Sequence, residues 1–199
     1  MNDTSSWRND DNDLAVQAGQ DAAAFGTLYQ RYYARIYTYV RYRCADPSVA
    51  EDLVAQIFEQ MLIHIRRFDP ERAPFSAWLF GIARNLVSRH RRIQRRENHL
   101  PLEALSGKEC SLEREIETKV IRNAEIENLL AAIQDLEDEK RDLLALKFAA
   151  RLTNRQIASL TGLSEHNVGV ILFRTINHLR FGLRLKPAKE TPGLEREDE

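Results

Sequence analysis

The chain has 199 residues, of which 43% are hydrophobic and 30% charged, with only 8 Gly and 6 Pro. These values allow a packed core and exclude collagen-like and wholly disordered proteins. An apolar run of about 18 residues, a basic leader before an apolar stretch and a cysteine-rich pattern are all missing from the sequence, which argues against membrane insertion, secretion and a disulfide framework. We therefore expect a cytoplasmic protein.

The net charge of −1 conceals alternating charge blocks. Residues 31–97 carry a net charge of +6, residues 98–139 carry −7 and residues 140–189 carry +8, and each end of the chain carries −4. Charge that was only solvating helix surfaces would not be expected to segregate in this way. The blocks predict two separate basic surfaces for a polyanion.

The first half of the sequence predicts a disordered N-terminus over residues 1–11 and a helical bundle over residues 12–96. Asp13 is expected to cap a short helix. Asp21 is expected to cap a second helix, because apolar side chains recur at three- and four-residue steps as far as about Arg43.

Two more helices are predicted in this bundle. Asp46-Pro47 is typical of an N-cap followed by the first helical residue. A proline-bounded break over residues 69–74 then precedes a helix that starts with apolar residues at Phe75 and continues into basic ones.

The second half begins after a segment of different composition. Residues 97–123 hold Pro101, Gly107 and many glutamates, and they predict an acidic linker. Helical periodicity returns over residues 124–186, and an acidic tail follows over residues 187–199. The predicted fold class is all-α, with two small helical domains joined by an acidic linker.

The most specific local pattern lies over residues 153–174. Thr153 and Ser164 can each cap a helix, and Gly162 can adopt the positive φ of a tight turn between them. This pattern predicts a helix-turn-helix, whose second helix enters the DNA major groove with its first residues at base edges. An ordinary helical hairpin is the alternative. The candidate DNA contacts are Glu165, His166 and Asn167 for bases and Arg155 and Arg174 for phosphates.

A second basic cluster lies over residues 84–96, which contain six arginines and no acid. Such a cluster predicts phosphate contacts and strongly salt-dependent binding. Four aromatic residues lie just upstream, and aromatic side chains beside a basic track can stack on single-stranded bases. The helical spacing of Phe75 and Trp78 favours core packing for these two instead.

The two halves together resemble a bacterial sigma factor of the sigma-70 family, in its extracytoplasmic-function (ECF) group. The run AEDLV at 50–54, with IF at 57–58, is similar to the segment that binds the polymerase clamp. The run FSAWLFGIARN at 75–85, with the arginines after it, is similar to the segment that melts and reads the minus-ten promoter element. Residues 136–180 resemble the region that reads the minus-thirty-five element.

The resemblance implies three sets of contact residues. The minus-ten set is Phe68, Arg72, Phe75, Arg84, Asn85, Ser88, Arg89, Arg91, Arg92 and Arg95. The core polymerase set is Glu51, Asp52, Leu53, Gln56 and Glu59. The minus-thirty-five set is Arg155, Ser164, Glu165, His166, Asn167, Val170 and Arg174. The resemblance also implies that a flipped non-template base is held at the loop over residues 69–74, and that the acidic linker runs through the polymerase.

The implied partners are core RNA polymerase (through the β′ clamp and β flap), promoter DNA and an anti-sigma factor. The chain would then be no enzyme, with no cofactor and no metal, and its five histidines show no metal-ligand spacing. The sequence departs from the family at Gln56, where Glu is common, and at Ser88, where Asp is usual. It departs again at Gly169 and Val170, where Lys and Ser are common, which puts the strength of minus-thirty-five recognition in doubt.

Three other functions remain open at this point. A free-standing helix-turn-helix regulator would dimerise and bind a palindrome by itself. A nucleic-acid-processing enzyme would need a metal, nucleophile or phosphate-loop constellation that the sequence does not present. An adaptor with two basic domains would bind polymerase without opening promoters.

Overall fold

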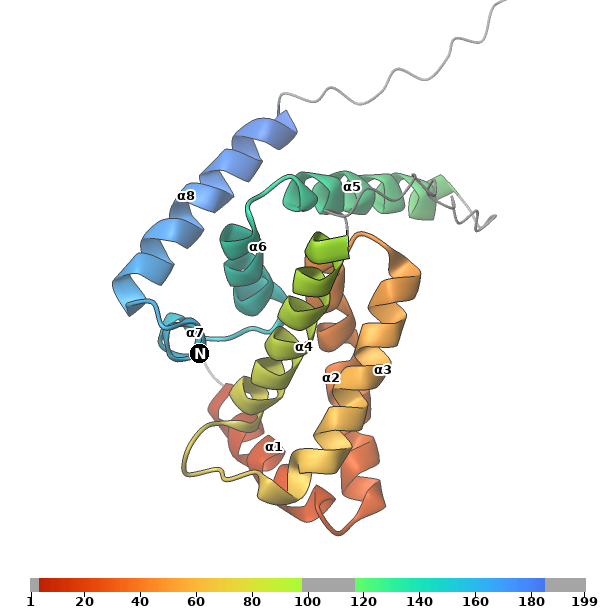
Figure 1. Cartoon of the computed structure of the whole chain (residues 1–199), viewed down its shortest axis with the longest axis vertical. Helices are drawn as coiled ribbons and strands as arrows, with labels where there is room; N and C mark the ends of the chain where they lie inside the picture. The colour runs from red at the N-terminus through yellow and green to blue at the C-terminus, as the bar shows by residue number, and fades with distance from the viewer. Residues whose placement is uncertain (1–3, 98–116, 185–199) are drawn as a thin grey trace, which may run out of the picture.

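The computed structural model describes residues 4–97 and 117–184, and within these ranges all regular structure is helical (Figure 1). The first half contains α1 Thr4–Ala18, α2 Ala22–Arg43, α3 Pro47–His64, the short 3₁₀ helix η1 Ile65–Arg67 and α4 Phe75–Glu97. The second half contains α5 Glu117–Gln134, α6 Asp138–Leu144, the π-helical turn η2 Ala145–Ala149, α7 Asn154–Thr161 and α8 Glu165–Arg184. The predicted all-α class is confirmed.

Local side-chain chemistry explains where the helices of the first half begin. The Asp21 carboxylate accepts a hydrogen bond from the backbone N–H of Ala23 at 2.8 Å. Asp46 caps α3 in the same way, with its carboxylate 2.8 Å from the N–H of Ser48, and Pro47 occupies the first helical position. Both predicted caps are confirmed, and each satisfies backbone donors that a helix N-terminus leaves without partners.

The core of the first half is rich in aromatic side chains. Tyr32 and Tyr39 of α2 and Phe75 and Phe80 of α4 are all fully buried. Phe75 and Tyr32 meet edge to face with ring centroids 5.1 Å apart, a favoured geometry for aromatic pairs. This packing fixes the start of α4 against α2.

The N-terminal segment differs from the prediction. Instead of a disordered stretch over residues 1–11 and a helix capped by Asp13, α1 is helical from Thr4. Arg31 forms ion pairs with Asp10 and Asp11, and the Tyr32 hydroxyl donates to Asp11 at 2.7 Å. The acidic side chains that suggested disorder are thus used as partners by α2.

The second half also differs from the prediction in its boundaries. Residues 117–123 of the predicted linker belong to α5. The helix expected from Asp138 to about Ala149 is divided into α6 and η2, and Arg151 just after it has a φ of 53°. The rest of the predicted linker, residues 98–116, and the predicted tail over residues 187–199 lie outside the described residues.

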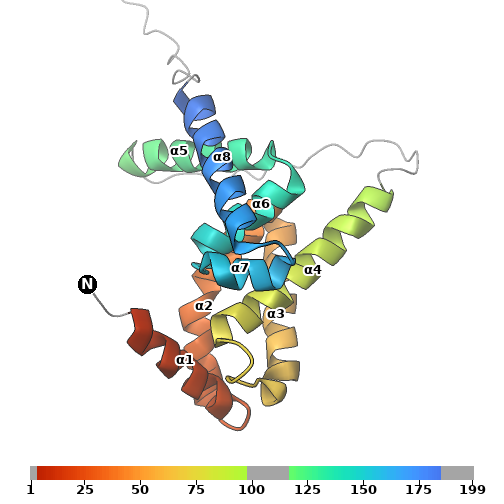
Figure 2. The ribbon, with the colours of Figure 1, turned by 90° about the vertical axis from the view of Figure 1, so that its left-hand side faces the viewer.

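The two halves pack against each other. Helix α2 contacts α5, α6 and η2, and α4 contacts α7, so that buried residues of both halves form one continuous hydrophobic cluster. Figure 2 shows α8 running away from the α1–α4 bundle, while α6 and α7 lie next to it. The sequence predicted two domains but not this contact between them.

Candidate nucleic-acid and polymerase interfaces

Helix α4 changes character along its length. Its first three turns bury Phe75, Leu79, Phe80, Ala83 and Val87. From Ser88 onward most side chains are exposed. The helix therefore presents a basic surface that is anchored by its own apolar start, as the charge pattern predicted.

The predicted minus-ten residues fall into three environments. Asn85, Ser88, Arg89 and Arg92 are exposed on α4, and Arg72 is exposed in the preceding loop, where it pairs with Asp69. These five side chains form an accessible polar and basic surface. Two aromatic members and three arginines of the set are placed differently.

The aromatic members of the set are packed in the core. Phe75 is fully buried and Phe68 is only 9% exposed, and their rings meet edge to face with centroids 5.6 Å apart. Half-buried Trp78 contacts both rings. In this arrangement neither phenylalanine offers a face on which a base could stack. Both phenylalanines belong to the core at the two ends of the loop over residues 69–74, and for Phe75 this is the core packing that its helical spacing indicated.

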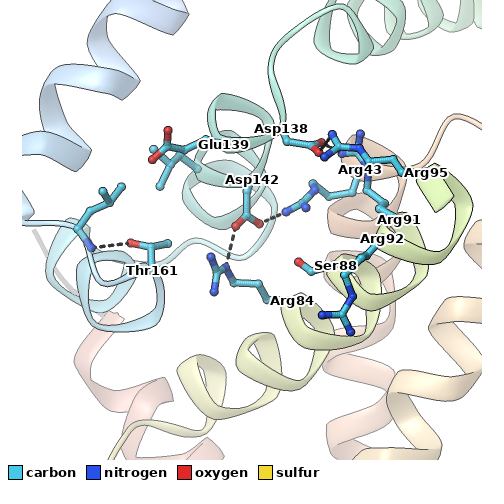
Figure 3. Close-up of a pocket in the computed structure, with 12 residues that line it drawn as sticks. Arg43, Arg84, Ser88, Arg91, Arg92, Arg95, Asp138, Glu139, Asp142 and Thr161 are labelled. Atoms are coloured by element: carbon cyan, nitrogen blue, oxygen red, sulfur yellow. Dashed lines mark hydrogen bonds and ion pairs between the residues drawn. The ribbon is translucent and has the colours of Figure 1, made fainter. Parts of the chain in front are cut away.

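The remaining three arginines are engaged by the second half of the chain. The Nε of Arg84 donates to Asp142 at 2.7 Å and its Nη1 donates to the carbonyl of Leu160 at 2.9 Å. Arg91 and Arg95 both pair with Asp138 (Figure 3). Burial lowers the pKa of Arg91, although the nearby negative charge of Asp138 acts in the opposite direction.

Asp142 lies at the centre of a buried polar cluster that the sequence analysis missed. Its carboxylate accepts hydrogen bonds from Arg43, Arg84 and, at 3.0 Å, from the Tyr39 hydroxyl. Burial and the adjacent carboxylate raise the pKa of Tyr39 well above its ordinary value, so the phenol stays a donor. Burial opposes the charge on Arg43, but the nearby Tyr39 and Asp142 raise its pKa overall.

The predicted polymerase-binding residues lie on α3. Glu51, Asp52, Gln56 and Glu59 are exposed, and Asp52, Gln56 and Glu59 share one face because they are spaced by four and three residues. Leu53 is only 3% exposed. The structure therefore places Leu53 in the core, where it supports the acidic face without being part of it.

The helix-turn-helix expected over residues 153–174 is present. Thr153 and Gln156 form a reciprocal capping box at the start of α7, and Gly162 has a φ of 79° at its end. The Ser164 hydroxyl accepts from the N–H of Asn167 at 3.2 Å and so caps α8. Buried Ile157 and Val168 lie at the crossing of the two helices. Each local prediction for this motif is confirmed.

The predicted minus-thirty-five residues are accessible together. Arg155, Ser164, Glu165, His166, Asn167 and Arg174 are exposed, and Val170 is half-buried. A surface hollow beside the first half of α8 is lined by Glu165, His166, Val170 and Arg174, and also by Gly169, Phe173 and Asn154, the first residue of α7. Phe173 is 68% exposed and was not among the predicted contact residues. Helical periodicity could have predicted its exposure, because it lies outside the buried face of α8 that contains Val168, Leu172 and Thr175.

Two further searches cover the described residues only. None of these helices combines the length and apolar character that a bilayer crossing needs. Within the same ranges, no group of three or more His, Cys, Asp or Glu side chains could hold a metal ion.

A helical bundle with an exposed basic helix, followed by a helix-turn-helix, defines a two-part DNA-binding protein. Comparison with known proteins assigns each part. Residues 28–97 match the model of sigma-70 region 2, and residues 126–179 match the model of sigma-70 region 4. We use these names, region 2 and region 4, for the two halves.

Curated relatives carry the same two regions. The chain is 32% identical over 167 residues to the ECF RNA polymerase sigma factor BldN of Streptomyces coelicolor, covering 82% of this chain and 61% of that protein. It is 26% identical over 154 residues to the ECF sigma factor SigM of Bacillus subtilis, covering 77% and 91%. The chain belongs to the sigma-70 family and is an ECF sigma factor, the class of non-enzymatic polymerase subunit that directs RNA polymerase to promoters.

Solved structures show the same fold. CnrH, in complex with the cytosolic domain of CnrY, superposes with a TM-score of 0.63 at 22% identity, covering 89% of this chain and 99% of CnrH. The sigma factor RpoE of Bartonella quintana, in complex with the anti-sigma factor NepR, superposes with a TM-score of 0.63 at 17% identity, covering 82% and 98%.

Proposed function

We propose that this chain binds core RNA polymerase through the exposed acidic face of α3 and positions region 2 and region 4 on the minus-ten and minus-thirty-five elements. The observation that supports this most directly is the pair of accessible polar surfaces, one on each half of the chain. Asn85, Ser88, Arg89 and Arg92 line one on α4, and the first turn of α8 provides the other.

The chemistry of the two surfaces differs in a way that fits the two elements. At α8, side chains at the start of a helix can reach base edges in an intact major groove. At α4, arginines hold backbone phosphates while a base leaves the stack, which costs a few kcal/mol. The exposed loop over residues 69–74, with its Asp69–Arg72 pair, is the candidate site for that base.

Two partners and a compartment complete the proposal. The β′ clamp would meet α3, and the β flap would meet region 4. The complex of RpoE with the anti-sigma factor NepR supports an anti-sigma partner for this chain as well. The chain would act in the cytoplasm, where its polymerase and DNA partners are found.

Transcription by the reconstituted holoenzyme tests the proposal. The purified chain is mixed with bacterial core polymerase and a genomic promoter library, and start sites and permanganate-reactive thymines are mapped. We expect start sites that share two upstream motifs, with opening that depends on the chain. A chain that binds no core polymerase but shifts duplex DNA as a dimer would instead indicate a free-standing regulator.

Matched variants assign the surfaces. Arg89→Ala should reduce opening at all promoters, because it removes a phosphate contact. Arg180→Ala is its control, since it removes the same charge from the far end of α8. Asn167→Ala should act mainly through the upstream motif. Asn177→Ala, on an exposed position ten residues further along the same helix, is its control. Equal effects of Asn167→Ala and Asn177→Ala would refute the assignment of the first turn of α8.

A further inference from the structure

Helix α1 lies beside the loop over residues 69–74, and neither matched region includes it. The first match begins at residue 28, so it assigns no role to residues 4–18. Figures 1 and 2 both show α1 next to the loop that joins the end of α3 to α4. The helix contacts η1, which precedes the loop, and α4, which follows it. Both ends of the candidate minus-ten loop therefore adjoin α1.

The end of the loop is tied to α1 by a hydrogen bond. The Asn12 Oδ1 accepts from the N–H of Phe75 at 2.8 Å. Pro74 directly precedes α4, and its carbonyl accepts the first helical bond, from the N–H of Trp78 at 3.1 Å. A proline has no side-chain oxygen, so it cannot cap a helix as the aspartates before α2 and α3 do. Asn12 therefore supplies from α1 the acceptor that the start of α4 lacks.

The segment just before the loop is tied to the other end of α1. Arg66 of η1 donates from its Nε to the carbonyl of Gly19 at 2.9 Å. A Cβ added at Gly19 would lie 3.4 Å from Cγ of Arg66, so the two segments are in close contact. Carbonyls at a helix C-terminus carry partial negative charge, which a guanidinium group stabilises. One helix thus holds the chain on both sides of the loop.

Helix α1 is itself fixed to the bundle independently of the loop. Ala15 is fully buried and Ala18 is 6% exposed, and such small side chains allow close packing. Asp11 accepts from the Tyr32 hydroxyl at 2.7 Å and pairs with Arg31. These contacts join α1 to α2, so α1 is a rigid support for whatever it holds.

The loop has internal structure of its own but an exposed position. The carboxylate of Asp69 accepts from the N–H of Glu71 at 3.0 Å, and its carbonyl accepts from the N–H of Arg72 at 3.2 Å. Residues 69–72 are all exposed. The internal bonds fix the shape of this part of the loop, whereas its place on the bundle depends on how the two ends are held.

The charge of α1 favours an indirect role over contact with DNA. The helix carries three acids and one base, and Asp13 is exposed. Such a surface repels phosphates. A site that captures a flipped base, however, depends on groups held within about 0.5 Å of their productive geometry by the residues behind them. Helix α1 is in the right place to provide that support.

We propose that α1 is part of the minus-ten site, and that Asn12 is a positioning residue that fixes the loop over residues 69–74 for the captured base. The inference rests on the proposed function, because it takes this loop to be the base site. Loss of the Asn12 bond frees the end of the loop at Phe75 and leaves every group that could contact the base in place. Discrimination among bases therefore falls, while binding to core polymerase does not.

Base preference of the reconstituted holoenzyme tests the proposal. Each non-template position of the minus-ten element of one promoter is varied to all four bases, and the versions compete for opening. We expect Asn12→Ala to reduce the preference for the best base by about threefold or more at the captured position, since the site is held less precisely. Its affinity for core polymerase should stay within about twofold of wild type. Asn12→Asp keeps an acceptor and should restore the preference.

Asp46→Ala is the matched control for stability. It removes a side-chain cap of the same kind from the start of α3, whereas the loop follows η1 at the opposite end of α3. The two variants should lose comparable stability, but Asp46→Ala should keep the wild-type base preference. An equal loss of preference in both variants would reduce the effect to stability and overturn the proposal. An unchanged preference in Asn12→Ala would overturn it as well.

Hydrogen exchange of the free chain separates the inference from the proposed function. Asn12→Ala should speed exchange in the peptide that spans the loop and Phe75, because the N–H of Phe75 loses its acceptor. Unchanged exchange would refute the hold of α1 on the loop, whatever the holoenzyme does. Faster exchange with an unchanged base preference, in a holoenzyme that opens promoters, would sink the inference alone. A wild-type chain that opens no promoter would remove the proposed function and the inference together.

Discussion

Asn12 joins α1 to the start of α4, and its replacement gives a prediction that can be worked out from the structure. The Asn12 Oδ1 accepts a hydrogen bond from the N–H of Phe75 at 2.8 Å, across 63 residues of sequence. Phe75 is the first residue of α4, where backbone donors have no helical partner. Asn12 therefore caps α4 from another helix, next to the loop that precedes Phe75.

The cost of losing this cap follows from known side-chain caps. Replacing an Asn cap by Ala costs about 1 kcal/mol, within a range of roughly 0.5–2. The Phe75 N–H is partly buried, which favours the upper half of that range because a buried donor without a partner is costly. For a chain of this size, 1 kcal/mol lowers the melting temperature by about 2–4 °C.

Urea denaturation of the full-length chain measures this effect. Asn12→Ala should lower the midpoint at an unchanged m-value, which indicates a loss of stability without a change in the unfolded state. Asn12→Asp keeps an acceptor and places a negative charge at a helix N-terminus, so it should retain most of the stability. Asp13→Ala, at an exposed neighbour, is the control. A free energy of unfolding for Asn12→Ala that equals that of Asp13→Ala would refute the cap.

Three further predictions test the turn, the core and the thiol. Gly162→Ala should destabilise region 4 by about 1 kcal/mol, because an L-residue is strained at φ 79°. Gly182→Ala is the control, since Gly182 lies at a helical position with nothing within 4 Å, and it should be neutral or slightly stabilising. Calorimetry measures the stability of both variants. Leu53→Ala should lower the free energy of unfolding by about 2–5 kcal/mol, as for other buried leucines. An unchanged denaturation curve would instead indicate that Leu53 belongs to the polymerase-binding surface. Burial raises the pKa of the Cys44 thiol. In a Cys110→Ser chain we therefore expect negligible reaction of Cys44 with a thiol reagent at pH 8 until the chain is unfolded. Fast labelling of the folded chain would contradict the burial of Cys44.

Local chemistry could be predicted from the sequence because it depends on neighbours in the chain. The caps at Asp21, Asp46 and Thr153 and the left-handed Gly162 are all decided within four residues, and each was found where expected. The same reasoning failed for α1. Its polar residues suggested disorder because their partner, Arg31, lies 20 residues away on the next helix.

The candidate site shows the same limit. Helical periodicity alone indicated that Phe75 belongs to the core. It also places Leu53 on the apolar stripe of α3, and only the family resemblance assigned Leu53 to the polymerase contacts. Periodicity could not reveal which arginines of α4 are free. Arg84 and Arg91 are half-buried because carboxylates 58 and 47 residues further along the chain fold onto them.

A basic block therefore identifies the chemistry of a ligand without identifying the ligand. The region between residues 140 and 189 carries a net charge of +8, and Asp142 is one of its two acids. In the fold this carboxylate is buried against Tyr39, Arg43 and Arg84 of region 2. An acid that is nearly lost in the charge count of region 4 thus pairs with two arginines of region 2. Because guanidinium groups bind carboxylate and phosphate alike, a run of arginines in the sequence does not distinguish a carboxylate of the same chain from the phosphate of a nucleic acid.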